Sequence, residues 1–135
     1  CVITPHPGEA ARLLGLSTAE VQADRPAAAH ALSKKYTAVV VLKGAGSLIA
    51  SPDGRLAVCD QGHPAMATAG LGDVLAGLLG ALLAQGMNAF DAACLGVWLH
   101  ANAGAQEGKS GRGLAASDLI PAIRQLLEEQ APCLK

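Results

Sequence analysis

The sequence predicts an α/β protein in which helices cover a mostly parallel β-sheet. The chain has 135 residues, which fits one domain. Hydrophobic residues make up 51% of it but aromatic residues only 2%, so Ala, Leu, Val and Ile must build the core. Residues 37–43 form an unbroken β-branched and apolar run, typical of a strand that is buried on both faces. Residues 74–84 form an apolar run of helical length.

The segment before the central strand is expected to contain a strand end and several short helices. Residues 2–3 have the apolar character of a strand end, and a short helix is expected over residues 9–14. Ser17 and Glu20 have the spacing of a capping box, in which each side chain bonds to the backbone N–H of the other residue. A helix should therefore start there. A further helix with a proline in its first turn should cover about residues 26–36.

The segment after the central strand is expected to fold back as antiparallel strands. Residues 47–50 should pair with the central strand, and residues 56–60 should return as a third strand. Pro, Asp and Gly at residues 52–54 favour a tight turn between these two strands.

Three helices are predicted in the remainder of the chain. The first begins at residues 72–73 and ends at Gly86, and the second covers about residues 89–107. Ser117 is expected to cap the last helix, over about residues 118–129. Its inner face is expected to contain the apolar residues of the helical repeat, namely Leu119, Ile120, Ile123, Leu126 and Leu127.

Charge, hydropathy and cysteine spacing exclude several classes of protein. The net charge is −1 and no basic stripe is visible, so neither nucleic acid nor an anionic membrane is an expected partner. The apolar run is well short of the roughly 20 residues that span a bilayer. The wide spacing of the cysteines excludes metal-ligand pairs and favours reduced thiols in a cytoplasmic protein. They are Cys1, Cys59, Cys94 and Cys133.

The loop before the first long helix has the features of an anion site. Gly70, Gly72 and Asp73 form a Gly-x-Gly-Asp sequence at a helix start, where backbone N–H groups lack helical partners and the helix dipole is positive. Thr68 adds a hydroxyl nearby. Because a carboxylate is an unexpected choice for binding an anion, Asp73 is the candidate for a base that faces a phosphoryl donor. The alternative is that Asp73 only complements the helix dipole.

Two other positions are candidates for ligand contact. His6 follows the first strand, at the carboxyl end where open α/β sheets bind ligands, although a loop residue without function is the alternative. Lys43 ends the central strand at a glycine turn, and it is either a phosphate contact or a lysine that extends into solvent. His63 and His100 are weaker candidates, and a partly buried structural role is expected for His100.

Two glycine motifs do not indicate nucleotide binding by themselves. Gly-Lys-Ser at residues 108–110 lacks the preceding strand and the glycine spacing of a P-loop. The glycines of the Gly-x-Gly-Asp sequence lack the third glycine of a dinucleotide fingerprint, because Leu75 occupies that place.

Three motifs nevertheless form a recognisable set. They are Val-Ile-Thr-Pro-His-Pro-Gly-Glu at residues 2–9, Val-Leu-Lys-Gly-Ala-Gly-Ser at residues 41–47, and Met-Ala-Thr-Ala-Gly-Leu-Gly-Asp-Val-Leu-Ala-Gly at residues 66–77. In their order and spacing they resemble the carbohydrate-kinase-like family of NAD(P)HX dehydratases, in the ribokinase-like superfamily. The resemblance implies a ribokinase-like three-layer sandwich, present here in part as a parallel sheet with a β-hairpin edge and flanking helices. Residues 1–135 would be the carboxyl-terminal part of that single domain, a fragment without the upstream half.

The resemblance also implies an activity. Enzymes of this family repair hydrated NADH and NADPH, and the bacterial type is an ADP-dependent (S)-NAD(P)H-hydrate dehydratase, a carbon–oxygen lyase. The hydrate hydroxyl would be phosphorylated from ADP, and elimination of phosphate would then give NAD(P)H and AMP. ADP, or ATP in its place, would be the co-substrate, with Mg²⁺ as a helper.

The same resemblance assigns a role to each motif. Asp73 would be the catalytic base and would contact the hydrated nicotinamide, as would His6. The adenine nucleotide would be bound by Lys43, Gly44, Ala45, Gly46, Ser47 and Gly72, with Thr68 and Gly70 as further candidates. No residue is assigned as a metal ligand.

Three residues depart from the usual family sequence Gly-Asn-Pro-Gly-Met-Ala-Thr-Gly-Gly. His63, Ala65 and Ala69 replace an asparagine and two glycines, and a requirement for positive φ at either alanine would change the loop. The missing upstream half would leave an open sheet edge. The chain is therefore expected either to form a homo-oligomer or to show little activity alone. The alternative functions are a kinase of a small-alcohol vitamin precursor and a nucleotide-binding or assembly module without turnover.

Overall fold

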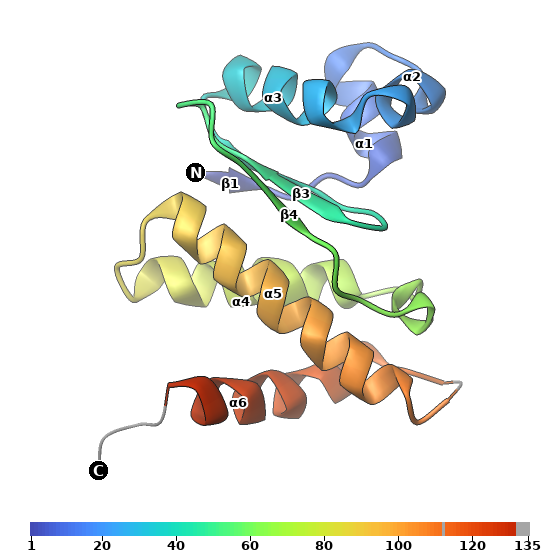
Figure 1. Ribbon diagram of the computed structural model, residues 1–135, viewed down its shortest axis with the longest axis vertical. Coiled ribbons are helices and arrows are strands. Elements are labelled where there is room, and N and C mark those ends of the chain that lie inside the picture. The colour runs from blue at the N-terminus through green and yellow to red at the C-terminus, as the bar shows by residue number, and fades with distance from the viewer. Residues whose placement is uncertain (112, 132–135) are drawn as a thin grey trace.

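A four-stranded β-sheet lies between two sets of helices in the computed structural model, which describes residues 1–111 and 113–131 (Figure 1). The strands lie in the sheet in the same order as in the chain: β1 (Val2–Ile3), β2 (Val39–Leu42), β3 (Ser47–Ala50) and β4 (Leu56–Cys59). Strands β1 and β2 are parallel, whereas β2, β3 and β4 form an antiparallel meander. The parallel pair with a hairpin edge is the arrangement predicted from the sequence.

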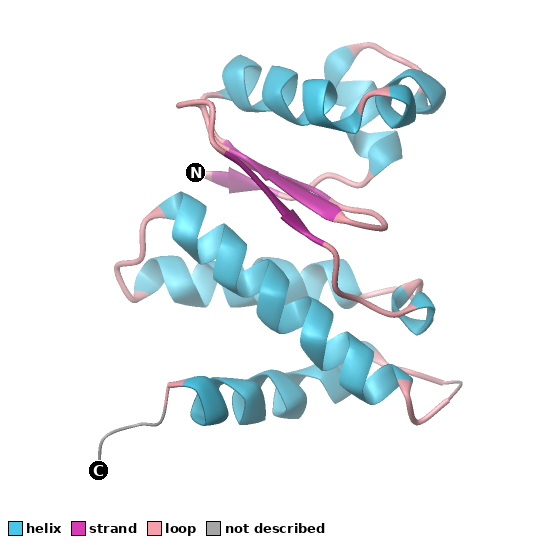
Figure 2. Ribbon diagram, in the orientation of Figure 1, coloured by secondary structure: helices cyan, strands magenta, loops and turns pink. Residues whose placement is uncertain are grey.

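The helices form layers on both sides of this sheet, as Figure 2 shows. One side carries three short helices, which are α1 (Pro7–Leu14), α2 (Thr18–Ala23) and α3 (Arg25–Tyr36). The other side carries two longer helices, which are α4 (Leu71–Ala84) and α5 (Ala89–Gly108). Helix α6 (Leu119–Gln130) packs against α5 as an outer layer. Two short 3₁₀ turns, η1 (Pro64–Met66) and η2 (Ala116–Asp118), precede α4 and α6.

Strand β2 is the centre of the hydrophobic core. All four of its residues are buried, and alternate side chains point to opposite faces of the sheet. Val40 and Leu42 join the cluster under α1–α3, whereas Val39 and Val41 join the cluster over α4 and α5. The unbroken apolar run in the sequence is therefore explained by burial on both faces, as predicted.

Helix α2 begins at the capping box expected from the sequence. The N–H of Glu20 donates to Ser17 Oγ at 3.2 Å, and the N–H of Ser17 donates to Glu20 Oε2 at 2.8 Å. The bond from the Ser17 N–H, and a second bond from the Ser17 hydroxyl at 2.7 Å, hold the pKa of the Glu20 carboxyl below its usual range. Two N–H groups that the helix leaves free are satisfied in this way, which explains a helix of only six residues.

The start of α6 differs from the prediction in two respects. Ser117 does not cap the helix, because it lies inside the η2 turn, where Asp118 Oδ2 accepts a hydrogen bond from the N–H of Ala115 at 2.8 Å. Ile120 is 61% exposed and lies on the outer side of α6, whereas Leu119 and Ile123 are buried. The helix starts at Leu119, after the η2 turn, and its buried face is formed by Leu119, Ala122 and Ile123, which leaves Ile120 on the outside.

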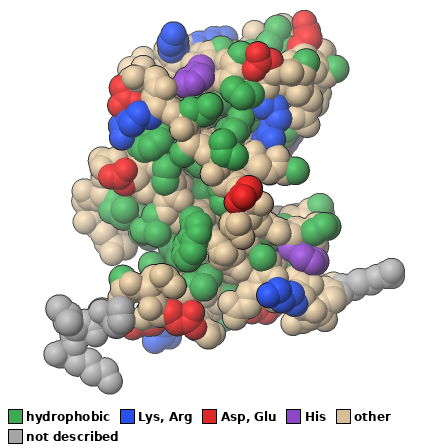
Figure 3. All heavy atoms as spheres, in the orientation of Figure 1, with side chains coloured by type: hydrophobic (Ala, Val, Ile, Leu, Met, Phe, Trp, Pro, Cys, Tyr) green, Lys and Arg blue, Asp and Glu red, His purple; other side chains and the backbone are tan. Residues whose placement is uncertain are grey.

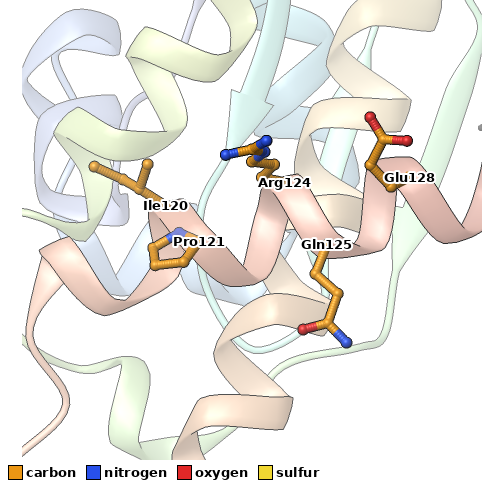
Figure 4. Close-up of a pocket in the computed structure, with 5 residues that line it drawn as sticks. All are labelled: Ile120, Pro121, Arg124, Gln125 and Glu128. Atoms are coloured by element: carbon orange, nitrogen blue, oxygen red, sulfur yellow. The ribbon is translucent and has the colours of Figure 1, made fainter. Parts of the chain in front are cut away.

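The outer side of α6 carries a shallow hollow beside Ile120. Figure 4 shows the residues that line it, which all come from this helix: Ile120, Pro121, Arg124, Gln125 and Glu128. Figure 3 shows a second group of apolar side chains on the face where β4 and α5 lie in front. The large apolar residues with substantial exposure on these two elements are Leu56, Val58 and Trp98.

The described cysteines are free thiols, namely Cys1, Cys59 and Cys94, and Cys133 lies outside the described residues. Burial raises the pKa of the Cys94 thiol. Across residues 1–111 and 113–131, no helix combines the length and the apolar character that a bilayer span requires.

Helices α4 and α5 pack closely at Gly96, which predicts a large difference between two glycine substitutions. A Cβ atom at Gly96 would lie 2.5 Å from Leu79 Cδ2, so Gly96→Val should lower the free energy of unfolding by about 1–3 kcal/mol. At Gly80, on the exposed side of α4, a Cβ atom would meet nothing within 4 Å. Gly80→Ala should therefore raise the free energy of unfolding by about 0.5–1 kcal/mol. Urea denaturation measures both, and equal effects would contradict this packing.

Candidate functional site

The residues predicted to bind the nucleotide meet where β2 ends and α4 begins. A Cβ atom built on Gly72 would lie 3.2 Å from Lys43 Nζ, so the amine of Lys43 lies against the first turn of α4. Lys43 follows the last residue of β2, and Gly72 is the second residue of α4. The fold therefore brings a cation to the helix end where free N–H groups already favour an anion.

His6 lies on the same side of this junction and caps α1. Its Nδ1 accepts hydrogen bonds from the N–H groups of Gly8 at 3.1 Å and Glu9 at 3.3 Å. The carboxylate of Glu9 in turn accepts a hydrogen bond from the His6 N–H at 2.7 Å. The loop that was predicted to bind the substrate is thus rigid, because its histidine is part of a capping box.

Glu9 connects this loop to Lys43. Its Oε2 lies 3.9 Å from Lys43 Nζ, and its Oε1 lies 3.5 Å from His6 Nε2. The hydrogen bond from the His6 N–H lowers the pKa of the Glu9 carboxyl, burial opposes this shift, and the charge of Lys43 lowers the pKa by a smaller amount. Glu9 was not predicted as a site residue. Its place three residues after His6, the spacing of a capping box, is the signal that could have found its bond with His6.

The first turn of α4 carries the predicted base. Asp73 is the third residue of the helix and is exposed, and its N–H bonds to the carbonyl of Gly70 at 3.1 Å. Gly70 has a positive φ of 84°, and a Cβ atom there would lie 3.1 Å from Ala116 Cβ. A glycine is therefore needed for both conformation and space at the turn into α4. The carboxylate of Asp73 is left facing outward next to Gly72.

His100 on α5 forms a hydrogen bond with the first residue of α4. Its Nε2 lies 2.8 Å from the carbonyl oxygen of Leu71. Burial lowers the pKa of His100, the bond to Leu71 partly opposes that shift, and the charge of Lys43 lowers the pKa further. The neutral ring must therefore carry its proton on Nε2 in order to donate to a carbonyl. The expectation of a partly buried structural histidine fits this geometry.

The loop between β4 and α4 is anchored on the last turns of α5. His63 caps the η1 turn, because its Nδ1 accepts from the Ala65 N–H at 3.2 Å. The His63 ring lies against Gly108, where a Cβ atom would be 2.5 Å from Nδ1. Met66 lies in the same way against Gly104, with its sulfur 2.3 Å from the position of a Cβ atom. His63, which stands where the usual family sequence has asparagine, thus caps the η1 turn.

The two alanines in this loop do not distort it. Within residues 1–111 and 113–131, Thr37 is the one non-glycine residue with a positive φ, so Ala65 and Ala69 have ordinary backbone conformations. Positive φ values in the loop fall on Gly62 and Gly70. The turn into α4 therefore requires no positive φ at either alanine.

The remaining predicted residues lie in the turn after β2 and in the loop before α4. Ser47 starts β3, and its hydroxyl donates to the Gly44 carbonyl at 3.4 Å. Thr68 is exposed in the loop before α4. In the part of the chain that the structure describes, no cluster of three His, Cys, Asp or Glu side chains is suited to a metal ion.

Comparison with known proteins assigns this architecture to a family. The sequence profile of the NAD(P)H-hydrate dehydratase family matches residues 1–125. The fold and the Gly-x-Gly-Asp helix start define a ribokinase-like protein, and the chain belongs to the NAD(P)H-hydrate dehydratase family within that class.

Individual relatives agree with this assignment. The chain is 57% identical over 129 residues to the bifunctional NAD(P)H-hydrate repair enzyme Nnr of Vibrio cholerae, covering 93% of this chain and 26% of that protein. It is 49% identical to the ADP-dependent (S)-NAD(P)H-hydrate dehydratase of Neisseria meningitidis, covering 93% of this chain and 43% of that protein. The chain therefore spans less than half the length of these relatives.

Solved structures show the same fold. The ADP/ATP-dependent NAD(P)H-hydrate dehydratase of Bacillus subtilis, co-crystallised with ATP/Mg²⁺, matches with a TM-score of 0.86 and 30% identity, over 95% of this chain and 47% of that chain. A ribokinase-like superfamily protein of Enterococcus faecalis matches with a TM-score of 0.84 and 27% identity, over 98% of this chain and 45% of that chain. The predicted ribokinase-like fold class is thereby confirmed.

The bond between His100 and Leu71 predicts a pH-dependent stability. Because the folded state lowers the pKa of His100 below its usual 6.5, the unfolded chain binds the proton more readily. The stabilising contribution is complete above about pH 6.5 and is lost as the pH falls through the folded-state pKa. His100→Gln keeps a donor for Leu71 but does not titrate. As the pH falls from about 7 to about 5, the free energy of unfolding should therefore decrease less in this variant than in the unmodified protein.

Thermal denaturation at a series of pH values measures this difference. His30→Gln on α3 is the control for loss of a histidine outside the site. Parallel pH dependence of the unmodified protein and the His100→Gln variant would show that His100 does not titrate in this way.

Proposed function

We propose that this chain carries the nucleotide-binding and base-bearing part of an ADP-dependent (S)-NAD(P)H-hydrate dehydratase. The observation that carries the proposal is the contact of Lys43 Nζ with Gly72, beside the outward-facing carboxylate of Asp73. Family membership and the names of the relatives support the reaction. In this proposal residues 1–135 are the carboxyl-terminal part of one ribokinase-like domain of a cytoplasmic, homo-oligomeric enzyme.

The first chemical step is phosphoryl transfer to the hydrated nicotinamide. The hydroxyl oxygen of the hydrate attacks the terminal phosphorus of ADP, the bond from that phosphorus to the AMP oxygen breaks, and Asp73 accepts the hydroxyl proton. Lys43 and the free N–H groups at the start of α4 stabilise the charge on the transferring group. The amine of Lys43 lies against Gly72, and the exposed Asp73 is the next residue of the helix, which suits a donor phosphate and an acceptor hydroxyl.

The second step is elimination. Hydroxide is a poor leaving group, whereas the phosphate ester formed in the first step leaves readily as phosphate. Departure of phosphate with loss of a proton from the neighbouring ring carbon restores the double bond of NADH or NADPH. His6, held by Glu9 at the carboxyl end of β1, contacts the hydrated ring in this proposal. The products are NAD(P)H, AMP and phosphate.

Mg²⁺ enters this proposal as part of the nucleotide. The described residues offer no carboxylate cluster for a resident metal ion, so the ion would be held by the phosphates of ADP or ATP. The remaining nucleotide contacts are assigned to the turn after β2 and the loop before α4, at Gly44, Ala45, Gly46, Ser47, Thr68 and Gly70.

An assay of cofactor repair tests the function. The full-length protein and the 135-residue chain are each incubated with hydrated NADH and either ADP or ATP, and the absorbance of the reduced nicotinamide is followed. Recovery of NADH with ADP is expected for the full-length protein. No recovery with either nucleotide would overturn the proposal and favour a binding module or a kinase of another small alcohol.

Replacing the proposed base gives a sharper prediction. Asp73→Asn keeps the shape of the side chain but removes its basicity, so kcat should fall by about 10²–10⁴-fold while the Kd for ADP stays nearly constant. Asp91→Asn is the matched control, because Asp91 is likewise an acidic residue in the first turn of a helix, α5. If both variants lose only stability and keep their turnover, Asp73 serves the helix dipole and is not the base.

A further inference from the structure

Arg25 connects α3 to the turn that follows β2. It is the first residue of α3, and its guanidinium donates to three backbone carbonyls of a segment 17 to 20 residues away. Nη1 bonds to the Ala45 oxygen at 2.6 Å, and Nη2 bonds to the Leu42 and Lys43 oxygens at 3.3 and 3.4 Å. The Arg25 side chain therefore binds most of the turn that contains Lys43.

These bonds determine which way the turn presents its N–H groups. In a trans peptide the carbonyl of one residue and the N–H of the next point in opposite directions. With the carbonyls of residues 42, 43 and 45 turned toward Arg25, the N–H groups of Lys43, Gly44 and Gly46 are turned away from it. The N–H of Lys43 bonds to the Pro5 carbonyl at 2.9 Å.

The other two N–H groups remain available. Among the described residues, neither the Gly44 nor the Gly46 N–H donates a backbone hydrogen bond outside the regular strands, and both residues lie outside those strands. Their φ values are +150° and +69°, conformations that glycine adopts without strain. Two donors and the Lys43 amine thus belong to one short turn, an arrangement that binds anions.

Gly44 leaves room for the Arg25 guanidinium beside the turn. A Cβ atom there would lie 2.8 Å from Arg25 Nη2, so a side chain at this position would displace the guanidinium from the turn. Nε of Arg25 is buried without a hydrogen-bond partner, so the bonds of the guanidinium to the turn are made by Nη1 and Nη2. The guanidinium lies on the carbonyl side of the turn, opposite to the free N–H groups.

We propose that Arg25 is a positioning residue for the nucleotide site: it binds the carbonyls of the turn after β2 and thereby orients the Gly44 and Gly46 N–H groups and the Lys43 amine toward the phosphates of the adenine nucleotide. The inference rests on the proposed function of this turn. Arg25 itself does not contact the nucleotide.

Steady-state kinetics of the full-length protein tests this role with Arg25→Met and Arg25→Lys. Loss of hydrogen bonds from a charged group should raise the KM for ADP by roughly tenfold or more in Arg25→Met, with kcat and the KM for hydrated NADH changed less than about threefold. Arg25→Lys retains the charge and a donor for one carbonyl, so its KM for ADP should lie between those of Arg25→Met and the unmodified protein.

Arg55→Met is the matched control. Arg55 also has a paired guanidinium, bound to Asp53 at 2.8 Å, but it lies at the turn between β3 and β4, at the opposite end of these strands. Its loss should leave the KM for ADP unchanged. Melting temperatures of all variants separate a change in stability from a change in affinity, and Arg25→Lys supplies the kinetic result if Arg25→Met does not fold.

The outcomes distinguish the two proposals. If the unmodified protein repairs hydrated NADH and Arg25→Met has an unchanged KM for ADP, Arg25 does not position the site. A fall in kcat alone, or an equal effect of Arg55→Met, would likewise overturn the inference. If the unmodified protein neither binds ADP nor repairs hydrated NADH, the proposed function itself fails.

Discussion

Burial of β2 on both faces is the constraint on which the rest of the structure depends. A strand of four apolar residues exposes neither face to water, so helices must cover it on each side. That requirement places α1–α3 on one face and α4 and α5 on the other. The carboxyl end of β2 then emerges between the two layers. Lys43, the first residue after the strand, can reach the start of α4 because the strand that carries it is held from both sides.

The candidate site is assembled from four segments, and each is fixed by a different kind of contact. A capping box holds His6, and a hydrogen bond from His100 holds the first turn of α4. The guanidinium of Arg25 holds the turn after β2. Packing of Met66 on α5 holds the loop before α4. The N–H groups that we propose to face the phosphates are consequently held in one orientation by the fold, which would lower the entropic cost of binding.

Local patterns in the sequence predicted most of the fold, and tertiary contacts account for what they missed. Apolar runs and capping residues located the strands and helices, and the three motifs indicated the family. Ser117 was misplaced because it lies inside the η2 turn that precedes α6, and Ile120 because packing buries Leu119, Ala122 and Ile123, a choice that periodicity does not reveal. His100 and Arg25 were not recognised as site residues, because their partners lie 29 and 17 to 20 residues away and no local signal marks such pairs. The roles of His6, Lys43 and Asp73 come from the family resemblance and from their placement in the fold.

The packing of the loop before α4 on the end of α5 has an evolutionary consequence. Gly104 and Gly108 are one helical turn apart, and each receives a side chain of the loop, Met66 and His63 respectively. A larger residue at 104 or 108 would displace the loop and, with it, the start of α4. Positions 63 and 108, and likewise 66 and 104, should therefore vary as pairs among related proteins. A lineage that changes the loop residue must accommodate the change on a helix some 40 residues further along the chain.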